Sequence, residues 1–212
     1  MKIGHVRLED IISIFVGKYG DQVQQLLKKV ATLDVKIICP LHGPILKENL
    51  EFYINKYDIW SSYKPEDDGV LIAYNSIHGN TKHAMEKLAC ILEEEGAKKV
   101  VLSDLARDDM AETIEDAFRY DKLIIASPTY DAGLFPYMEK FLRHLKHKNY
   151  QNRKIGIIEN GSWAPAAAKY MKEIICPMKN ITICDPIITI KSTMNENTIK
   201  QMSELAKDIL AK

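Results

Sequence analysis

The chain has 212 residues and 46% of them are apolar, so it can bury a globular core and does not have the composition of a disordered protein. Its 29 Lys and Arg balance its 29 Asp and Glu, which argues against a nucleic-acid partner. The apolar runs are far shorter than the roughly 20 residues of a membrane span. The charged start does not resemble a signal peptide. We therefore expect a cytoplasmic protein that binds neither nucleic acid nor a membrane.

The cysteines are widely spaced along the chain. They are Cys39, Cys90, Cys176 and Cys184. They form no C-x-x-C pair and have no histidine at metal-finger spacing. Because free cysteine is among the residue types most often buried, we interpret all of them as small buried apolar side chains.

A charged stretch with a proline and a glycine, residues 63–69, separates two parts of different character. Before it, the sequence predicts one or two helices over 9–30, a short buried strand over 35–39, a turn at 41–44 and a helix that ends near 60–62. These elements are too few for an independent core. We expect residues 1–68 to be a small N-terminal α/β remnant that packs on the following domain or on another subunit.

After this break, short apolar runs alternate with helical patterns, a rhythm typical of βαβ units in a parallel sheet. The expected strands are 70–74, 100–102, 123–126, 155–158 and 181–190, and the expected helices are 81–95, 110–118, 136–148, 164–175 and 199–210. Asn80, Pro136 and Asn195 occupy helix-start positions and Gly96 a helix end. Residues 69–212 are therefore expected to form a flavodoxin-like, doubly wound, five-stranded parallel sheet in the order 2-1-3-4-5.

The loop after the first strand has the features of a phosphate site. It contains Ser76, Ile77, His78, Gly79, Asn80 and Thr81. Backbone N–H groups at a helix N-terminus attract an anion, and the hydroxyls of Ser76 and Thr81 can donate hydrogen bonds to it. The loop has neither the Gly-Lys-Ser/Thr ending of a triphosphate loop nor the three-glycine dinucleotide fingerprint. Taken alone, it is also compatible with a simple capped helix start.

The loops after the third and fourth strands each add a large aromatic ring. The candidate residues in them are Pro128, Thr129, Tyr130, Asp131 and Gly133, followed by Asn160, Gly161, Ser162 and Trp163. Ligands of open parallel sheets bind outside the carboxyl ends of the strands, where these loops lie. We therefore expect a planar aromatic ligand bordered by Tyr130 and Trp163, although either ring alone is more typical of a core.

Three of these segments together carry a family resemblance. They read SIHGNT at 76–81, SPTY at 127–130 and GSW at 161–163. In this order and spacing they resemble the flavodoxin domain of flavodiiron proteins, also called A-type flavoproteins. The stretches KIICPLHGPI at 36–45 and YDIWS at 57–61 look like the end of that family's metallo-β-lactamase-like domain.

The resemblance implies a cofactor, a function and partners. The cofactor is FMN, with its phosphate in the first loop and its isoalloxazine ring between Tyr130 and Trp163. The implied function is electron transfer with a redox partner protein, either rubredoxin-like or a flavin reductase. The resemblance also implies a head-to-tail dimer, in which the flavin of one subunit approaches the iron of the other. A homodimer is therefore one expected arrangement.

The ligands of the family's diiron centre are mostly missing from the sequence. Such a centre needs several carboxylate and imidazole ligands, and His42 alone has a counterpart here. We interpret His42, His144 and His147 as structural or solvated side chains, while His5 stands alone near the start. We therefore predict no metal site and no catalytic residue in this chain by itself. The metal domain then belongs to a separate chain, or the protein is a stand-alone FMN carrier.

Two other functions stay open. One is a flavin-dependent NAD(P)H:acceptor reductase, which is disfavoured because the sequence shows no motif for a second, dinucleotide-binding site. The other is a cofactor-free flavodoxin-like interaction module. Receiver modules of this topology cluster acidic residues at the end of the first strand, where this chain has Asn75 and Ser76.

Overall fold

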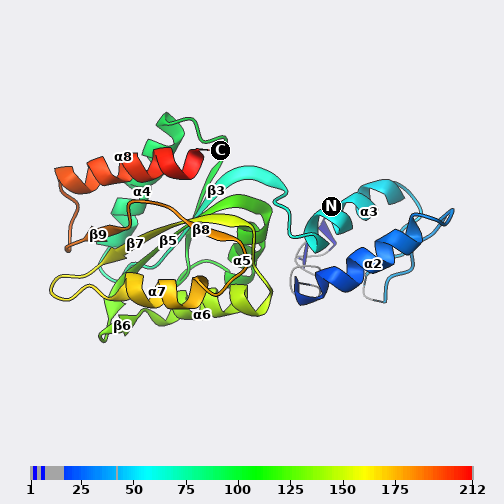
Figure 1. Ribbon diagram of the computed structural model, residues 1–212, viewed down its shortest axis with the longest axis horizontal. Helices are drawn as coiled ribbons and strands as arrows, with labels where there is room; N and C mark the ends of the chain where they lie inside the picture. Colours follow the sequence, from blue (N-terminus) through cyan, green and yellow to red (C-terminus); the bar gives the residue numbers. More distant parts are fainter. Residues whose placement is uncertain (1, 4–5, 8–16, 42, 212) are drawn as a thin grey trace.

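A parallel sheet with helices on both faces forms the main body of the protein (Figure 1). The computed structural model describes residues 2–3, 6–7, 17–41 and 43–211. The strands of the sheet are β3 (Asp67–Tyr74), β4 (Val100–Asp104), β5 (Tyr120–Tyr130), β7 (Arg153–Asn160), β8 (Ile181–Ile183) and β9 (Ile188–Ile190). They run in the order β4-β3-β5-β7-β8, and β9 also pairs with β7. Because β8 and β9 share the outer position, the predicted order 2-1-3-4-5 is confirmed.

The two faces of the sheet are covered by different helices (Figure 1). Helices α4 (Asn80–Glu94) and α8 (Glu196–Leu210) pack on one face, and α5 (Met110–Arg119), α6 (Pro136–His147) and α7 (Ala167–Ile175) on the other. Successive side chains of a strand point to opposite faces. Leu123 and Ile125 of β5 accordingly belong to one buried cluster, and Ile124 to the other. Apolar residues on both faces of the central strands are thus required by this layered packing.

Helix ends follow the signals in the sequence. Asn195 and Thr198 form a reciprocal capping box at the start of α8, and Pro136 occupies the first turn of α6. Gly79 precedes α4 with φ +91°, and Gly96 follows it with φ +93°, conformations that glycine adopts without steric cost. α7 begins at Ala167, three residues later than predicted, because the preceding residues fold against the end of β5.

Helices α2 (Gly20–Val30) and α3 (Leu50–Ser61) pack against each other beside the sheet (Figure 1). Nε2 of Gln24 links them by donating to Oδ1 of Asp58 at 2.8 Å and to Oγ of Ser61 at 2.9 Å. Short strands β1 (Lys2–Ile3) and β2 (Val6–Arg7) pair antiparallel nearer the start. The prediction of one or two helices over 9–30 is confirmed for residues 20–30, which form α2, while residues 9–16 lie outside the described residues.

The prediction of a short buried strand over residues 35–39 is wrong. Ile38 makes only an isolated antiparallel bridge to Leu46, and Ile37 and Cys39 are exposed. An apolar run becomes a buried strand only where neighbouring strands and a covering layer are present. The described part of the chain supplies neither at this position, so the segment stays extended and open to solvent.

The interpretation of the cysteines as buried is correct for Cys184 and wrong for the others. Cys184 lies in the core beside β8, and burial raises the pKa of its thiol to about 12. Cys90 is on the solvent side of α4, Cys176 follows the last turn of α7, and Cys39 lies in the open segment described above. Their positions in amphipathic or irregular segments, not residue type, decide their exposure.

The described residues include no helix that is long and apolar enough to cross a lipid bilayer.

The buried side chain of Arg153 ties the segment after α3 to the sheet. Only 3% of Arg153 is exposed. Its guanidinium donates to the carbonyl oxygens of Tyr63 at 2.8 Å, Tyr120 at 2.9 Å and Phe118 at 2.6 Å, and to two carbonyls of its own loop. Because hydrogen bonds from a charged donor are the stronger kind, this side chain joins three chain segments at the amino ends of the strands.

We expect Arg153→Met to destabilise the protein by about 3 kcal/mol, because several buried carbonyls then lack a donor. Urea unfolding measures the loss. The control is Arg143→Met on the exposed side of α6, which we expect to cost about 0.5 kcal/mol or less. Equal stability of the two variants would show that Arg153 does not hold these segments together.

Candidate functional site

The candidate site lies where β3, β5 and β7 end. The parallel register pairs Tyr74 with Ala126 and Ala126 with Ile158, so these strands reach the same edge of the sheet side by side. The three loops singled out in the sequence follow these strand ends. The sheet therefore brings the predicted site residues to one edge, as expected for a doubly wound fold.

The first loop is folded around a glycine turn. The backbone N–H of Gly79 donates to Oγ of Ser76 at 3.1 Å, and α4 begins immediately afterwards. Ser76 is 8% exposed and Thr81 is 3% exposed, whereas Ile77, His78 and Asn80 reach solvent. A Cβ atom on Gly79 would meet nothing within 4 Å. The N-terminus of α4 thus faces open space, with its backbone donors available to an anion.

Asn75 precedes this loop and is an unusual buried polar residue. Its side chain is fully buried, and neither its Oδ1 nor its Nδ2 has a hydrogen-bond partner among the described residues. Buried amides are nearly always paired, so an unpaired one marks a place where a further polar group fits. The end of β3 thereby fits a polar ligand. Asn75 was not among the site residues predicted from the sequence.

Asn160 connects the first loop to the end of β7 and to a segment that follows β9. Its Nδ2 donates to Oγ1 of Thr81 at 3.3 Å and to the carbonyl of Ser192 at 3.1 Å. Its Oδ1 accepts the backbone N–H of Ser192 at 3.0 Å. The amide of Asn160 is therefore engaged within the protein, where it orients Thr81. Ser192 was missed because its contribution is made by backbone groups, which carry no sequence signal.

The second segment is a tight hairpin and not the irregular loop that was predicted. β5 continues through Pro128 and Thr129 to Tyr130 and pairs antiparallel with β6 (Gly133–Leu134). Asp131 and Ala132 between them both have positive φ, at 49° and 56°. Two such residues form the turn that suits a two-residue hairpin. Local strand patterns did not reveal the extension, because a proline interrupts the apolar run.

The hairpin presents an aromatic ring to solvent. Tyr130 is 49% exposed. Its ring packs edge-on against Phe135, with 5.3 Å between the centroids. Phe135 in turn stacks on Tyr137 at 6.0 Å. Phe135 thus supports Tyr130 from one side, and the half-exposed face of Tyr130 is available to a planar ligand.

The third loop folds back onto the second. The backbone N–H of Gly161 donates to the carbonyl of Ile190 at 3.0 Å. A Cβ atom on Gly161 would lie 3.1 Å from Cα of Pro165 and 3.2 Å from Oγ1 of Thr129. A side chain at position 161 would therefore require these neighbours to move by a few tenths of an ångström.

Side chains from β5 and β7 cap the helix that follows the third loop. Oγ1 of Thr129 accepts the backbone N–H of Ala166 at 2.9 Å and that of Ala167 at 3.3 Å. Oε2 of Glu159 accepts the N–H of Ala168 at 2.9 Å. The start of α7 has no capping side chain of its own, so these two residues satisfy its first donors and fix the loop.

Trp163 stands at the tip of the third loop. It is 98% exposed and makes no ring contact with Tyr130 in the part of the chain that the structure describes. Ser162 beside it is exposed as well. A free tryptophan ring gains most from a partner that covers its face. Both predicted rings are thus exposed, in segments that follow the ends of the adjacent strands β5 and β7.

Charged groups play a small part at this edge. Lys82 is about half exposed and pairs weakly with Glu86, with 3.9 Å between Nζ and Oε1. Tyr74 ends β3, where burial, reinforced by the nearby carboxylate of Asp104, raises the pKa of its phenol to about 12. This phenol is therefore neutral at physiological pH. The first loop offers backbone dipoles and hydroxyls to an anion more than it offers cations.

No group of three or more His, Cys, Asp or Glu side chains that could hold a metal ion occurs among the residues that the structure describes. His144 is half-buried and His147 is exposed, both on α6. His5 and His42 lie outside the described residues, and the interpretation of them is left as a prediction.

Comparison with known proteins decides the family. The model of the flavodoxin domain matches residues 71–182, which is more than half of the chain. The chain belongs to the flavodoxin-domain family. Flavodoxin domains and flavodiiron proteins bind FMN. The same residues carry the strands and loops of the candidate site up to β8.

The chain is also similar to flavodiiron proteins. Rubredoxin-oxygen oxidoreductase from Megalodesulfovibrio gigas is 26% identical over 200 residues, covering 92% of this chain and 48% of that protein. An uncharacterized protein from Methanocaldococcus jannaschii is 25% identical over 200 residues, covering 94% and 50%. The resemblance inferred from the sequence is therefore confirmed.

Solved structures agree with this relationship. A flavo di-iron protein from Thermotoga maritima superposes with a TM-score of 0.81 at 26% identity, covering 95% of this chain and 51% of that one. The rubredoxin oxygen oxidoreductase from Desulfovibrio gigas gives a TM-score of 0.85 at 22% identity, with 95% and 50% covered, which shows the fold alone. The chain spans about half the length of the curated relatives it matches.

We expect Thr129→Val to loosen the third loop, because valine keeps the shape of threonine but cannot accept the two N–H groups at the start of α7. Loss of a helix cap costs about 1 to 2 kcal/mol. Urea unfolding should show this loss, and amide hydrogen exchange should quicken at residues 166 and 167. Thr182→Val, at an exposed position of β8, serves as the control. Unchanged exchange in the Thr129 variant would contradict the capping role.

Proposed function

We propose that this protein binds FMN at the edge formed by β3, β5 and β7 and transfers electrons through it. One observation carries the proposal. The first loop and two exposed aromatic rings follow the ends of the parallel strands β3, β5 and β7, which lie side by side. Membership of the flavodoxin-domain family supports it, because FMN is the cofactor of that family. Such proteins supply binding, orientation and electrostatics, and the flavin supplies the redox chemistry.

The phosphate of FMN is assigned to the first loop. Residues 76–81 provide backbone N–H groups at the start of α4 together with the hydroxyls of Ser76 and Thr81. Gly79 leaves room for an oxygen atom to approach the backbone. Asn160, at the end of β7, holds Thr81 in position. A dianion bound in this way is stabilised by dipoles, which agrees with the neutral net charge of the chain.

The flavin ring is assigned to the space between the second and third segments. Tyr130 and Trp163 offer their faces to it, while backbone groups of residues 128–133 and 160–163 meet its polar edge. Aromatic rings beside the flavin, with few cations near, disfavour the added negative charge of its reduced form. We therefore expect a lower reduction potential than that of free FMN.

We assign residues 69–212 to the FMN module and residues 1–68 to the tail of a metallo-β-lactamase-like domain and its linker. Among the described apolar residues and glycines at positions 18–60, Gly20 alone is buried. This exposure supports the view that residues 1–68 pack against another domain or subunit. The diiron ligands would then belong to a separate metal-domain chain or to a part of the protein outside this sequence. The expected redox partner is rubredoxin-like or a flavin reductase, and a homodimer fits the family pattern.

We expect Thr81→Asp to weaken FMN binding by about 100-fold or more, because it sets a carboxylate against the phosphate in a poorly solvated loop. The variant should be purified with little bound flavin, whereas the unaltered protein should show flavin absorbance. Fluorescence titration of the two apoproteins with FMN measures the difference.

The control for this change is Asn197→Asp. Asn197 occupies the second helical position of α8, as Thr81 does in α4, so both variants add one negative charge to the first turn of a helix. The control should bind FMN as the unaltered protein does. If Thr81→Asp and Asn197→Asp bind FMN equally well, the phosphate does not lie in the first loop.

A further inference from the structure

Helix α6 carries a basic face that starts at the candidate flavin site. The helix begins at Pro136, two residues after β6 of the hairpin that bears Tyr130. Its exposed basic residues are Lys140, Arg143, Lys146 and His147. Glu139 is the one acidic residue of the helix, and both Nε and Nη2 of Arg143 donate to its Oε1, at 2.9 and 2.7 Å. The face thus carries a net positive charge, although the whole chain is neutral.

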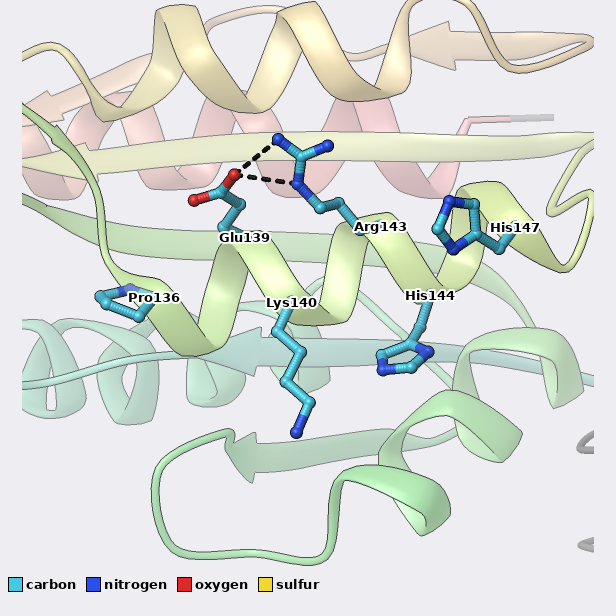
Figure 2. Close-up of a pocket in the computed structure, with 6 residues that line it drawn as sticks. All are labelled: Pro136, Glu139, Lys140, Arg143, His144 and His147. Atoms are coloured by element: carbon cyan, nitrogen blue, oxygen red, sulfur yellow. Dashed lines mark hydrogen bonds and ion pairs between the residues drawn. The ribbon is translucent and has the colours of Figure 1, made fainter.

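Figure 2 shows how Pro136, Glu139, Lys140, Arg143, His144 and His147 of α6 lie around a shallow hollow of about 390 Å³. Lys140 and His144 extend to one side of the helix axis, and the pair of Glu139 and Arg143 lies on the other. Lys140 and Lys146 form no ion pair with any residue that the structure describes. Their charges are therefore available to a partner.

The positive charges of this face affect the pKa of His144. Partial burial, together with the charges of Lys140 and Lys148, lowers the pKa of His144. Like charges at this spacing disfavour each other. Binding of a negatively charged partner would reduce the repulsion between these positive charges.

The basic residues of α6 adjoin a second basic helix on one side and an acidic helix on the other. α7 carries Lys169 and Lys172 with the single acidic residue Glu173. α5 carries three acidic residues and one arginine in its ten positions. α8, on the far face of the sheet, mixes Glu196, Glu204 and Asp208 with Lys200 and Lys207. Charge complementarity therefore points to an acidic partner on one particular side of the molecule.

The end of α6 nearest the site adds apolar contact surface. Tyr137 is 46% exposed and stacks on Phe135, which supports Tyr130. Rigid aromatic side chains beside cationic ones are typical of protein interfaces. A protein docked on α6 would therefore contact the aromatic cluster next to the space assigned to the flavin ring.

We propose that the basic face of α6, with the aromatic cluster of Tyr130, Phe135 and Tyr137 at its end, is the docking surface for a small acidic electron-transfer protein. The proposal rests on the proposed function, because it names the partner class of the same site. Docking here brings a redox centre of the partner to the rim of the flavin site. The long-range attraction speeds the encounter at low salt and weakens as salt screens it.

The test uses two iron proteins of opposite charge as electron acceptors: oxidised rubredoxin, which is acidic, and oxidised cytochrome c, which is basic. The FMN-loaded protein is reduced without oxygen and mixed with either one in a stopped-flow instrument. Each acceptor molecule takes one electron at its ferric iron, which becomes ferrous. Two acceptor molecules therefore oxidise one reduced FMN, and the protons that the flavin had gained return to water.

We expect the second-order rate with rubredoxin to fall as salt is added, and to fall about tenfold or more at low salt in Lys140→Glu/Arg143→Glu. The rate with cytochrome c should not fall in that variant. Lys200→Glu/Lys207→Glu makes the same change in net charge at exposed positions of α8, which covers the other face of the sheet, and should stay within about twofold of the unaltered protein. If the first variant is unstable, Lys140→Gln/Lys146→Gln replaces it, because glutamine places no further acidic group beside Glu139. This variant should also react more slowly with rubredoxin than the unaltered protein does.

The outcomes separate the two proposals. The flavin content of every preparation is measured first by absorbance. Absence of FMN binding by the unaltered protein overturns the proposed function. Normal FMN content with a rubredoxin rate that is independent of salt, or equal in the α6 and control variants, overturns the docking surface alone.

Discussion

The side-by-side parallel pairing of β3, β5 and β7 is the constraint on which the site depends. Because Tyr74, Ala126 and Ile158 stand in register, three loops that lie far apart in the sequence begin at one edge of the sheet. Burial of both faces under different helices fixes that register, since a slip of one residue would turn apolar side chains such as Leu123 to the wrong layer. The position of the loops is thus a consequence of core packing.

Within this frame, buried and half-buried polar residues hold the loops, and exposed residues are left for a ligand. Asn160 orients Thr81, while Thr129 and Glu159 cap the start of α7. Tyr130 and Trp163 remain largely exposed. Such a division suits the binding of a cofactor, because a rigid support lowers the entropic cost of arranging the contact groups. The same rigidity extends through Phe135 into α6 and its basic face.

Much of the fold could be predicted from the sequence, because local signals and the global topology agree. The apolar runs, the capping residue Asn195 and the glycine at position 79 lie where the helices and strands require them. The predictions failed where a distant contact decides the structure. The hairpin at 127–134 depends on strand pairing across a proline, and Ser192 contributes through its backbone. Ile37 and Cys39 are exposed because no covering layer reaches them among the described residues.

The most direct test of the account compares the binding of FMN and riboflavin to the purified apoprotein by fluorescence quenching. The two ligands have the same ring and differ by the phosphate that the first loop is assigned to bind. Charge-assisted hydrogen bonds to several backbone donors predict that FMN binds about 100-fold or more tightly than riboflavin. Equal affinity for the two ligands, or no affinity for either, would contradict a flavin site at the ends of β3, β5 and β7.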